Sequence, residues 1–251
     1  MSEAGSPALW FAPMVLAALL LAAPMHATAA EPQPAPCSAE QPWPPRLAME
    51  FVVQASRGVL GLEGVNELSL VVEGTRYRMR STTRSLLFSV QQDSRGSVDG
   101  RLLRPEEYVE RNPRREPAIT TIDWAAQQVH FSANRDAPAR TLPLLQDRLT
   151  LLLQLGERLR AARGDGEVEV AVAGVRHVSP YRFQRRGTEA VSVPAGTYDT
   201  VRLERLPAPG GAMEIWLAPS LCWLPIRLRY TDERGLVVDN RLRRVSLDER
   251  P

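Results

Sequence analysis

The chain has 251 residues, enough for one domain or at most two, and with 44% hydrophobic and 24% charged residues it has the composition of a globular protein. All 31 basic residues are arginine, and the formal net charge is only +2. So small a charge gives no indication of a nucleic-acid partner, and we expect none. Base composition explains the exclusive use of arginine; selection for anion-binding forks is the alternative.

The first 29 residues have the pattern of a secretory signal peptide. An apolar run over residues 15–23 is followed by Pro24 and by the small-residue site Ala27-Thr28-Ala29. The run is short for a membrane span, and no basic residue precedes it. Two interpretations stay open: the signal is cleaved on export, or it is retained as a membrane anchor. Either way we expect a periplasmic protein of a Gram-negative bacterium, with membrane contact only if the signal is retained.

Residues 30–45 form a proline-rich lead in which only Cys37 and Trp43 are expected to pack. Cys37 and Cys222 make a single possible pair, and in an oxidising compartment a disulfide is the natural use of such a pair. Two unrelated thiols are the alternative. The absence of a C-x-x-C motif gives no indication of a redox catalyst.

From residue 46 to 249 we expect a single β-rich domain. Apolar residues alternate with polar ones over 47–53, 68–72 and 76–84, which is typical of half-buried strands. Further on, 86–90 and 97–103 predict a hairpin around a turn at 93–96, and the polar stretch 105–117 predicts a surface excursion. The pieces 119–123 and 129–131 predict another hairpin.

Arginines recur on one face of the strand predicted over 76–84. Together with two arginines of a later strand they could form a basic sheet face; its members are Arg76, Arg78, Arg80, Arg84, Arg227 and Arg229. Such a face could dock an anionic partner, whereas a solvated outer surface is the alternative.

One amphipathic helix is predicted at about 147–162. Leu149, Leu152, Leu153 and Leu159 recur at helical spacing, and Asp147 can cap the helix. Short strands follow up to residue 247, including three over 191–230 separated by proline and glycine turns. The expected fold is therefore mainly β: an antiparallel meander that forms a barrel or half-barrel, with the helix packed on or in it.

The stretch from Val193 to Val201 reads VPAGTYDTV, and it is followed by Ile215-Trp216-Leu217 and Leu224-Pro225-Ile226-Arg227. With Gly100 to Pro105 and Tyr108, these motifs resemble the exported bacterial domain-of-unknown-function family 3108 over roughly residues 46–247. The resemblance implies an exported β-rich protein without a known activity, so no catalytic residue can be carried over from it.

Chemistry-bearing residues are sparse. His130 and His177 each stand alone, without metal-ligand spacing, and Asp199 and Glu204 lie on opposite strand faces. We therefore expect no enzyme, no cofactor and no metal. The leading hypothesis is a periplasmic protein that binds a lipid or other apolar ligand in a β-barrel-like cavity. A module that uses the basic face to dock a cell-envelope protein is the alternative, and an uncharacterised hydrolase that depends on His177 or Asp199 is the third.

Overall fold

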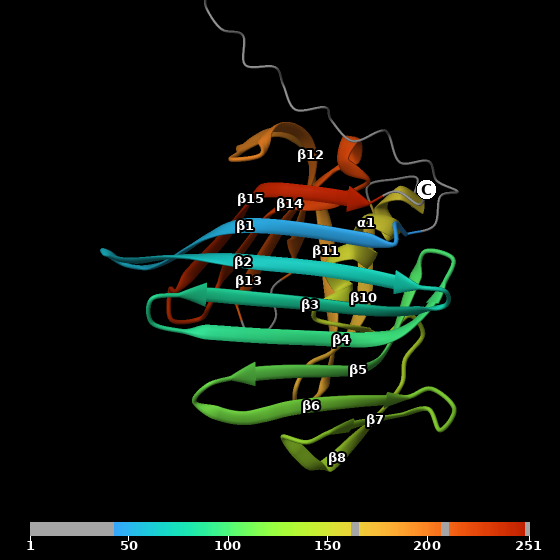
Figure 1. The fold of residues 1–251 in the computed structure, drawn as a ribbon. Coiled ribbons are helices and arrows are strands. Elements are labelled where there is room, and N and C mark those ends of the chain that lie inside the picture. The colour runs from blue at the N-terminus through green and yellow to red at the C-terminus, as the bar shows by residue number, and fades with distance from the viewer. Residues whose placement is uncertain (1–42, 162–165, 207–210, 249–251) are drawn as a thin grey trace, which may run out of the picture. The chain divides into compact units, whose positions relative to one another are not determined.

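A computed structural model describes residues 43–161, 166–206 and 211–248, apart from the side chains of residues 136 and 137 (Figure 1). The predicted signal and most of the proline-rich lead lie outside these ranges. Among the residues described, no helix is both long and apolar enough to cross a membrane.

The described residues form fifteen strands in one sheet, one α-helix and one short 3-10 helix. The strands before the helix are β1 (Arg46–Arg57), β2 (Leu60–Glu73), β3 (Arg76–Ser85), β4 (Ser89–Asp99), β5 (Leu102–Asn112), β6 (Arg115–Asp123), β7 (Gln128–Phe131), β8 (Asn134–Arg140) and β9 (Gln146–Asp147). After α1 (Thr150–Ala161) come β10 (Glu167–Ala173), β11 (Val178–Val193), β12 (Gly196–Arg205), β13 (Ala212–Ala218), η1 (Pro219–Leu221), β14 (Leu224–Thr231) and β15 (Val237–Asp248).

The sheet consists of two runs of strands that meet where β1 pairs with β15. Its order is β8-β7-β6-β5-β4-β3-β2-β1-β15-β14-β13-β12-β11-β10-β9, so the first and the last strand pair with each other in its middle. Every pairing is antiparallel except that of β9 with β10. The sheet curls around α1, and its edge strands β8 and β9 do not pair with each other (Figure 1). Of the two expected forms, the domain therefore takes the half-barrel.

Side chains, rather than backbone ladders, link the two arms of the sheet near its edges. Thr120 Oγ1 donates to the Gly174 carbonyl oxygen at 2.7 Å, and Asn134 Nδ2 donates to that of Arg176 at 3.1 Å. A small apolar cluster that includes Phe131, Leu145 and Ala173 packs behind these bonds. These contacts join the two arms of the sheet, although the edge strands β8 and β9 do not pair and the barrel does not close.

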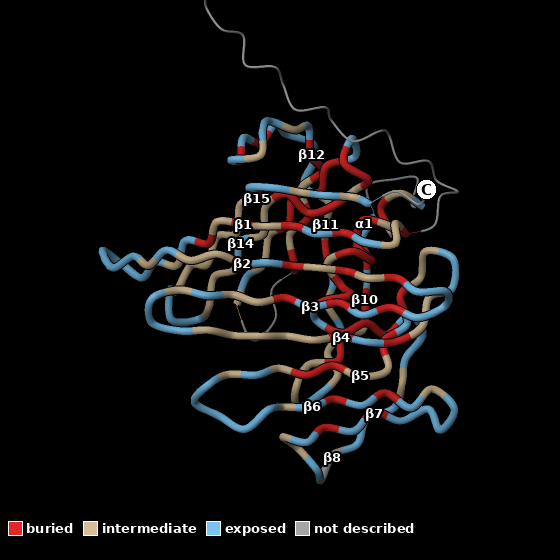
Figure 2. The backbone as a smooth tube through the Cα atoms, viewed as in Figure 1, coloured by how far each residue is buried: buried red, intermediate tan, exposed pale blue. Residues whose placement is uncertain are grey.

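The predicted alternation is confirmed in the strands that were recognised. In β1, Leu47, Met49, Phe51 and Val53 are all at most 2% exposed, whereas their neighbours face outwards. Figure 2 shows the buried residues gathered within the strands and on α1, with exposed residues at most of the turns.

Two predictions between residues 86 and 117 are wrong. The predicted turn at 93–96 lies inside the continuous strand β4, where β3 and β5 satisfy the backbone groups on both sides. Gly96 is needed there for close packing, because a Cβ would lie 2.1 Å from the Arg104 carbonyl oxygen. The real turn before β4 contains Leu86 and Leu87, which are 96% and 64% exposed.

The predicted surface excursion over 105–117 is the hairpin of β5 and β6. Its polar residues face solvent on one side of the sheet, and this obscures the strand signal. Pro105 is tolerated because it sits at an irregularity in the β4–β5 ladder, next to the shift between Arg95 and Gly96.

The helix lies inside the curl and is apolar on two sides. Leu149, just before it, and Leu153 join the larger core cluster, whereas Leu151, Leu155 and Leu159 join a second one. Gly156 lets the helix approach the β13–β14 connection, since a Cβ would lie 2.3 Å from the Trp223 carbonyl oxygen. This contact explains a glycine that weakens the helix itself.

Trp43 packs as expected for the end of the proline-rich lead. It is 3% exposed, its indole Nε1 donates to the Arg101 carbonyl oxygen at 3.0 Å, and the Arg101 guanidinium lies over its ring at 4.5 Å. The residue therefore anchors the start of the domain against the turn between β4 and β5.

Candidate ligand-binding cavity

A cavity of about 1070 Å³ occupies the part of the concave face that α1 leaves uncovered. Most of its wall is apolar. The strands contribute Phe51, Val53, Leu68, Met213, Leu228 and Val238, and the helical segment contributes Leu149, Leu151 and Leu152. Strands from both arms of the curled sheet line it, so it exists only in the folded half-barrel.

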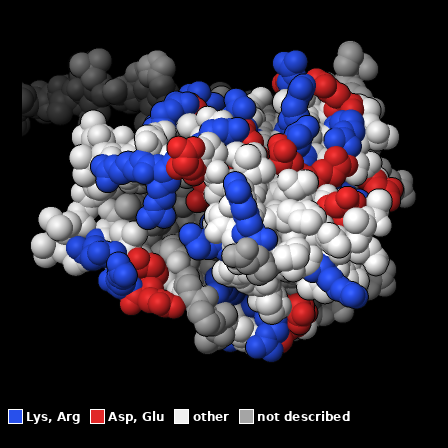
Figure 3. Space-filling model, turned by 90° about the horizontal axis from the view of Figure 1, so that it is seen from below, with Lys and Arg blue, Asp and Glu red and all other residues white. Residues whose placement is uncertain are grey.

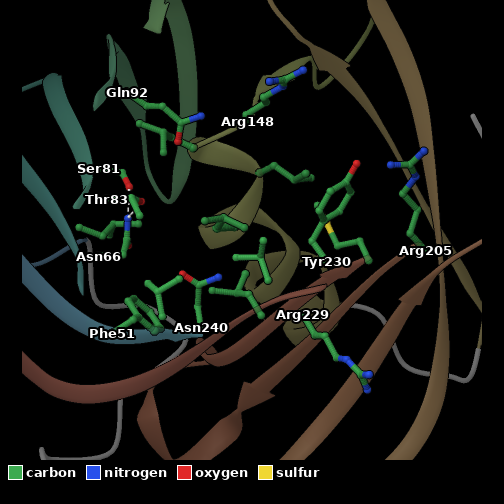
Figure 4. Close-up of a pocket in the computed structure, with 18 of the residues that line it drawn as sticks. Phe51, Asn66, Ser81, Thr83, Gln92, Arg148, Arg205, Arg229, Tyr230 and Asn240 are labelled. Atoms are coloured by element: carbon green, nitrogen blue, oxygen red, sulfur yellow. Dashed lines mark hydrogen bonds between the residues drawn. The ribbon is translucent and has the colours of Figure 1, made fainter. Parts of the chain in front are cut away.

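One side of the cavity carries a small patch of uncharged polar groups. Asn66 Nδ2 donates to Ser81 Oγ and to Thr83 Oγ1, both at 2.7 Å (Figure 4). Asn66 and Ser81 are only 8% and 5% exposed. These bonds join β2 to β3 and keep the amide group fixed in a largely apolar wall.

The other side of the cavity is cationic. Arg148 precedes α1 and Arg205 ends β12, and both lie with Tyr230 across the cavity from Phe51 and Asn66 (Figure 4). Arg205 is 5% exposed, and its guanidinium carbon Cζ lies 4.3 Å from the ring centre of Tyr181. Burial raises the pKa of Tyr230, while the charges of Arg205 and Arg148 act in the opposite direction. These two arginines and two tyrosines therefore form one electrostatic cluster.

The segment that carries Arg148 is fixed by Asp147, which is fully buried. Asp147 Oδ1 accepts the backbone N–H groups of Leu149 and Thr150, both at 2.8 Å, and Oδ2 accepts from the Ser94 hydroxyl. Burial raises the pKa of this carboxyl group, and the hydrogen bonds partly offset the effect. The predicted capping role of Asp147 is confirmed. It also ties the start of the helix to β4.

The predicted basic face lies on the outside of the sheet except at Arg229, which also lines the cavity, and acidic side chains accompany it. Arg76 pairs with Glu106 at 2.7 Å, Arg78 with Glu73 at 3.0 Å, and Arg80 with Asp93 at 2.5 Å. The remaining members follow the same rule: Arg84 pairs with Glu67, Arg227 with Asp239 and Arg229 with Glu214. Basic and acidic side chains also lie next to one another where the molecule is seen from below (Figure 3). The outer arginines thus form mixed-charge ladders rather than a purely cationic surface.

Cys222 lies between η1 and β14 and is 8% exposed. Its proposed partner Cys37 lies outside the described residues, so their pairing stays a prediction. Cys222 and the following Trp223 both adopt left-handed backbone conformations, with φ of 58° and 59°. This sharp turn brings the Trp223 carbonyl against Gly156 of the helix.

The residues considered for hydrolysis do not come together in the described structure. His177 lines the cavity and His130 is exposed on the distant strand β7. Asp199 is exposed on β12 and does not line the cavity, and no group of three described His, Cys, Asp or Glu side chains could hold a metal ion. The dependence of any activity on His177 or Asp199 stays a prediction.

Sequence reasoning missed Arg148, Arg205, Tyr181 and Asn66 as members of one site. A local signal existed for two of them. Arg205 continues the inward series of Val201 and Leu203, and Asn66 ends the inward series of Leu70 and Leu68. When a polar residue occupies the next inward position of an alternating strand, it indicates that this position lines a cavity and is not part of the apolar core.

One solved structure with a TM-score above 0.5 agrees with this architecture, and one family model matches most of the chain. The family model described as "Protein of unknown function (DUF3108)" matches residues 54–240. The crystal structure of a β-barrel-like DUF1849 protein from Brucella abortus is 11% identical, with a TM-score of 0.53, and the match covers 83% of this chain and 99% of that one. A candidate outer membrane lipoprotein-sorting domain from Vibrio parahaemolyticus is 9% identical, with a TM-score of 0.32 and coverage of 83% and 87%. A search of curated proteins found no match.

Proposed function

Because the chain belongs to the DUF3108 family, a family of proteins of unknown function, its membership brings no activity with it, and we propose its function from the cavity. The domain is a non-catalytic, exported binding protein that holds a lipid or other apolar molecule on the concave face of its half-barrel. Export to the periplasm is proposed from the signal pattern of residues 1–29.

One observation carries the proposal: a cavity of about 1070 Å³ with a mostly apolar wall lies between the helix and both arms of the sheet. Pockets for small molecules usually have volumes of about 300–1,000 Å³ and walls of this kind. An acyl chain matches the cavity in polarity.

The experiment compares two neighbouring valines of β15. Val238 lines the cavity, whereas Val237 is not among the residues that line it, and both are partly buried. A neutral fluorescent apolar probe is titrated into the wild type, Val238→Trp and Val237→Trp. We expect Val238→Trp to weaken probe binding at least about tenfold, because the indole occupies the cavity, and Val237→Trp to bind like the wild type.

Native mass spectrometry of protein from a periplasmic extract supplies an independent measurement. A ligand that is bound non-covalently and released on denaturation would support the carrier function, if less of it is bound to Val238→Trp than to the wild type. If the wild type binds no apolar probe and releases no mass, the proposal is wrong.

A further inference from the structure

Resting on the proposed function, we infer that the ligand is an anionic amphiphile: its negatively charged head lies at Arg148 and Arg205, and its apolar chain extends towards Phe51 and Leu68. The shared chemistry of the head is that of a carboxylate or a phosphate monoester.

The first observation is the sign of the charges around the cavity. The ionisable groups of its described lining are arginines, tyrosines and one histidine, and none is an aspartate or a glutamate. The chain as a whole has nearly as many acidic as basic residues, and the outer face of the sheet pairs them closely. The cavity therefore differs from the rest of the surface in carrying one sign of charge.

The second observation is the depth of Arg205. This arginine is 5% exposed at the end of a strand, on the same inward series as the fully buried Leu203. It lies over the Tyr181 ring, 4.3 Å from its centre, and Tyr181 itself lines the cavity. A charge at this depth is screened less by water than a charge on the outer face of the sheet, so it attracts an anionic head more strongly. The planar fork of the guanidinium suits carboxylate and phosphate oxygens.

The third observation is that Arg148 lies on the same side of the cavity as Arg205 (Figure 4). Arg148 Nη1 donates to Glu110 Oε2 at 3.2 Å, and Tyr108 is a second hydrogen-bond partner. A guanidinium has five N–H donors, so these two partners still leave donors for a ligand. The residue is partly exposed at the cavity, and buried Asp147 fixes the backbone next to it. Of the three arginines in the lining, Arg229 is directed away from this cluster (Figure 4) and pairs with Glu214 at 3.7 Å. Arg148 and Arg205 therefore remain as the head-binding pair.

The chain-binding part follows from the opposite wall. Phe51 and Leu68 are 1% and 3% exposed, and both line the cavity on strands that face the helix. A head held at Arg148 and Arg205 would direct its chain across the cavity to this wall (Figure 4). Burial of the apolar chain should therefore give affinity for any amphiphile. The charge of the head should determine which amphiphile binds most tightly.

The test is displacement of the neutral fluorescent probe from the wild-type domain by four amphiphiles with the same alkyl chain. They are dodecanoate, dodecyl phosphate, dodecanol and dodecyltrimethylammonium, all kept below their micellar concentrations. We expect at least one of the two anions to bind at least about tenfold more tightly than the alcohol, and the cation to bind most weakly. Comparison of dodecanoate with dodecyl phosphate identifies which anionic head the site prefers.

Variants assign the effect to the two arginines. Arg148→Gln and Arg205→Gln should each reduce the preference for the anion over the alcohol by about tenfold. Arg202→Gln is the matched control, since Arg202 lies on the opposite face of the same strand and pairs with Glu214 at 2.6 Å. If burial of Arg205 makes its glutamine variant unstable, Arg205→Lys keeps the charge, and the partly exposed Arg148 supplies the decisive variant.

Two failures are distinguishable. Equal binding of the anions, the alcohol and the cation, or an unchanged preference in Arg148→Gln, would overturn the inference and leave the apolar carrier function intact. No displacement by any amphiphile, with no binding of the probe itself, would overturn the proposed function as well.

Discussion

The two ends of the concave face are built by the same strands and yet have opposite characters. At the end that contains the start of β1, inward residues such as Met49, Leu70 and Met79 pack against Leu153 of α1 in a dry core. A few residues along the same strands, the inward positions of β2 and β3 become polar at Asn66, Ser81 and Thr83. A single meander thus provides both a stabilising core and a binding cavity, because the identity of its inward residues changes along each strand.

The comparison shows why the cavity stays open. In the packed end the inward residues share one apolar cluster with Leu153 of the helix, whereas in the open end the helix contributes only one side of the wall. Phe51 and Leu68 belong both to the core and to the proposed chain-binding wall, whereas Arg148 and Arg205 belong to neither core cluster. Three substitutions test the difference between the two ends, and their expected effects on stability run from the largest to the smallest.

The largest effect is expected for Leu153→Ala, with Leu152→Ala as its neighbour in the open end. Leu153 is 1% exposed in the core, whereas Leu152 is partly buried and lines the cavity. Leu153→Ala should lower the free energy of unfolding by about 2–5 kcal/mol, because it leaves a void in packed surroundings. Leu152→Ala should cost less than about 1.5 kcal/mol and should weaken probe binding. Chemical denaturation measures both, and equal losses would contradict the distinction between the two ends.

A smaller effect is expected for Gly156→Ala on the packed side of the helix. Helix propensity alone would favour alanine by about 1 kcal/mol. The new Cβ, however, would lie 2.3 Å from the Trp223 carbonyl oxygen, so we expect a net loss of about 1–3 kcal/mol. Gly61→Ala is the control, since nothing lies within 4 Å of its Cβ position and its φ is not positive. A thermal melt in which Gly156→Ala is the more stable variant would show that the helix is not tightly packed there.

The smallest effect is expected at Asp147, which ends β9 just before α1. Asp147→Ala leaves the Leu149 and Thr150 N–H groups without this acceptor and should cost about 1–2 kcal/mol at neutral pH. Asp147→Asn keeps an acceptor oxygen for these N–H groups and should cost less.

The same pair of variants tests a pH dependence. Since burial raises the pKa of Asp147 in the folded state, the folded protein binds a proton more tightly there than the unfolded chain does. The contribution of this group is therefore fully present below the unfolded pKa of about 4 and is lost as the pH rises through the folded pKa. The stability of the wild type relative to Asp147→Asn should fall over this window. A constant difference in urea midpoints across the same pH range would show that Asp147 does not titrate differently on folding.

Much of the local structure was predictable from the sequence, because it depends on spacings within a few residues. Period-two alternation marked the inward residues of β1, β3 and β14, and leucine spacing with Asp147 marked the helix. The same local reasoning misplaced the turn at 93–96. There Asp93, Ser94 and Gly96 have turn-forming tendencies that the ladders to β3 and β5 override.

What the sequence alone determined is the mainly β class, the direction in which most recognised side chains face, and the motifs that resemble the DUF3108 family. Only the tertiary structure decided that β1 pairs with β15, that the barrel stays open between β8 and β9, and that Arg148 and Arg205 share one cavity. The physical reason is the range of the interactions. Alternation and capping act between near neighbours, whereas pairing of the first and last strands, and the cavity that it creates, depend on the free energy of the whole packed sheet.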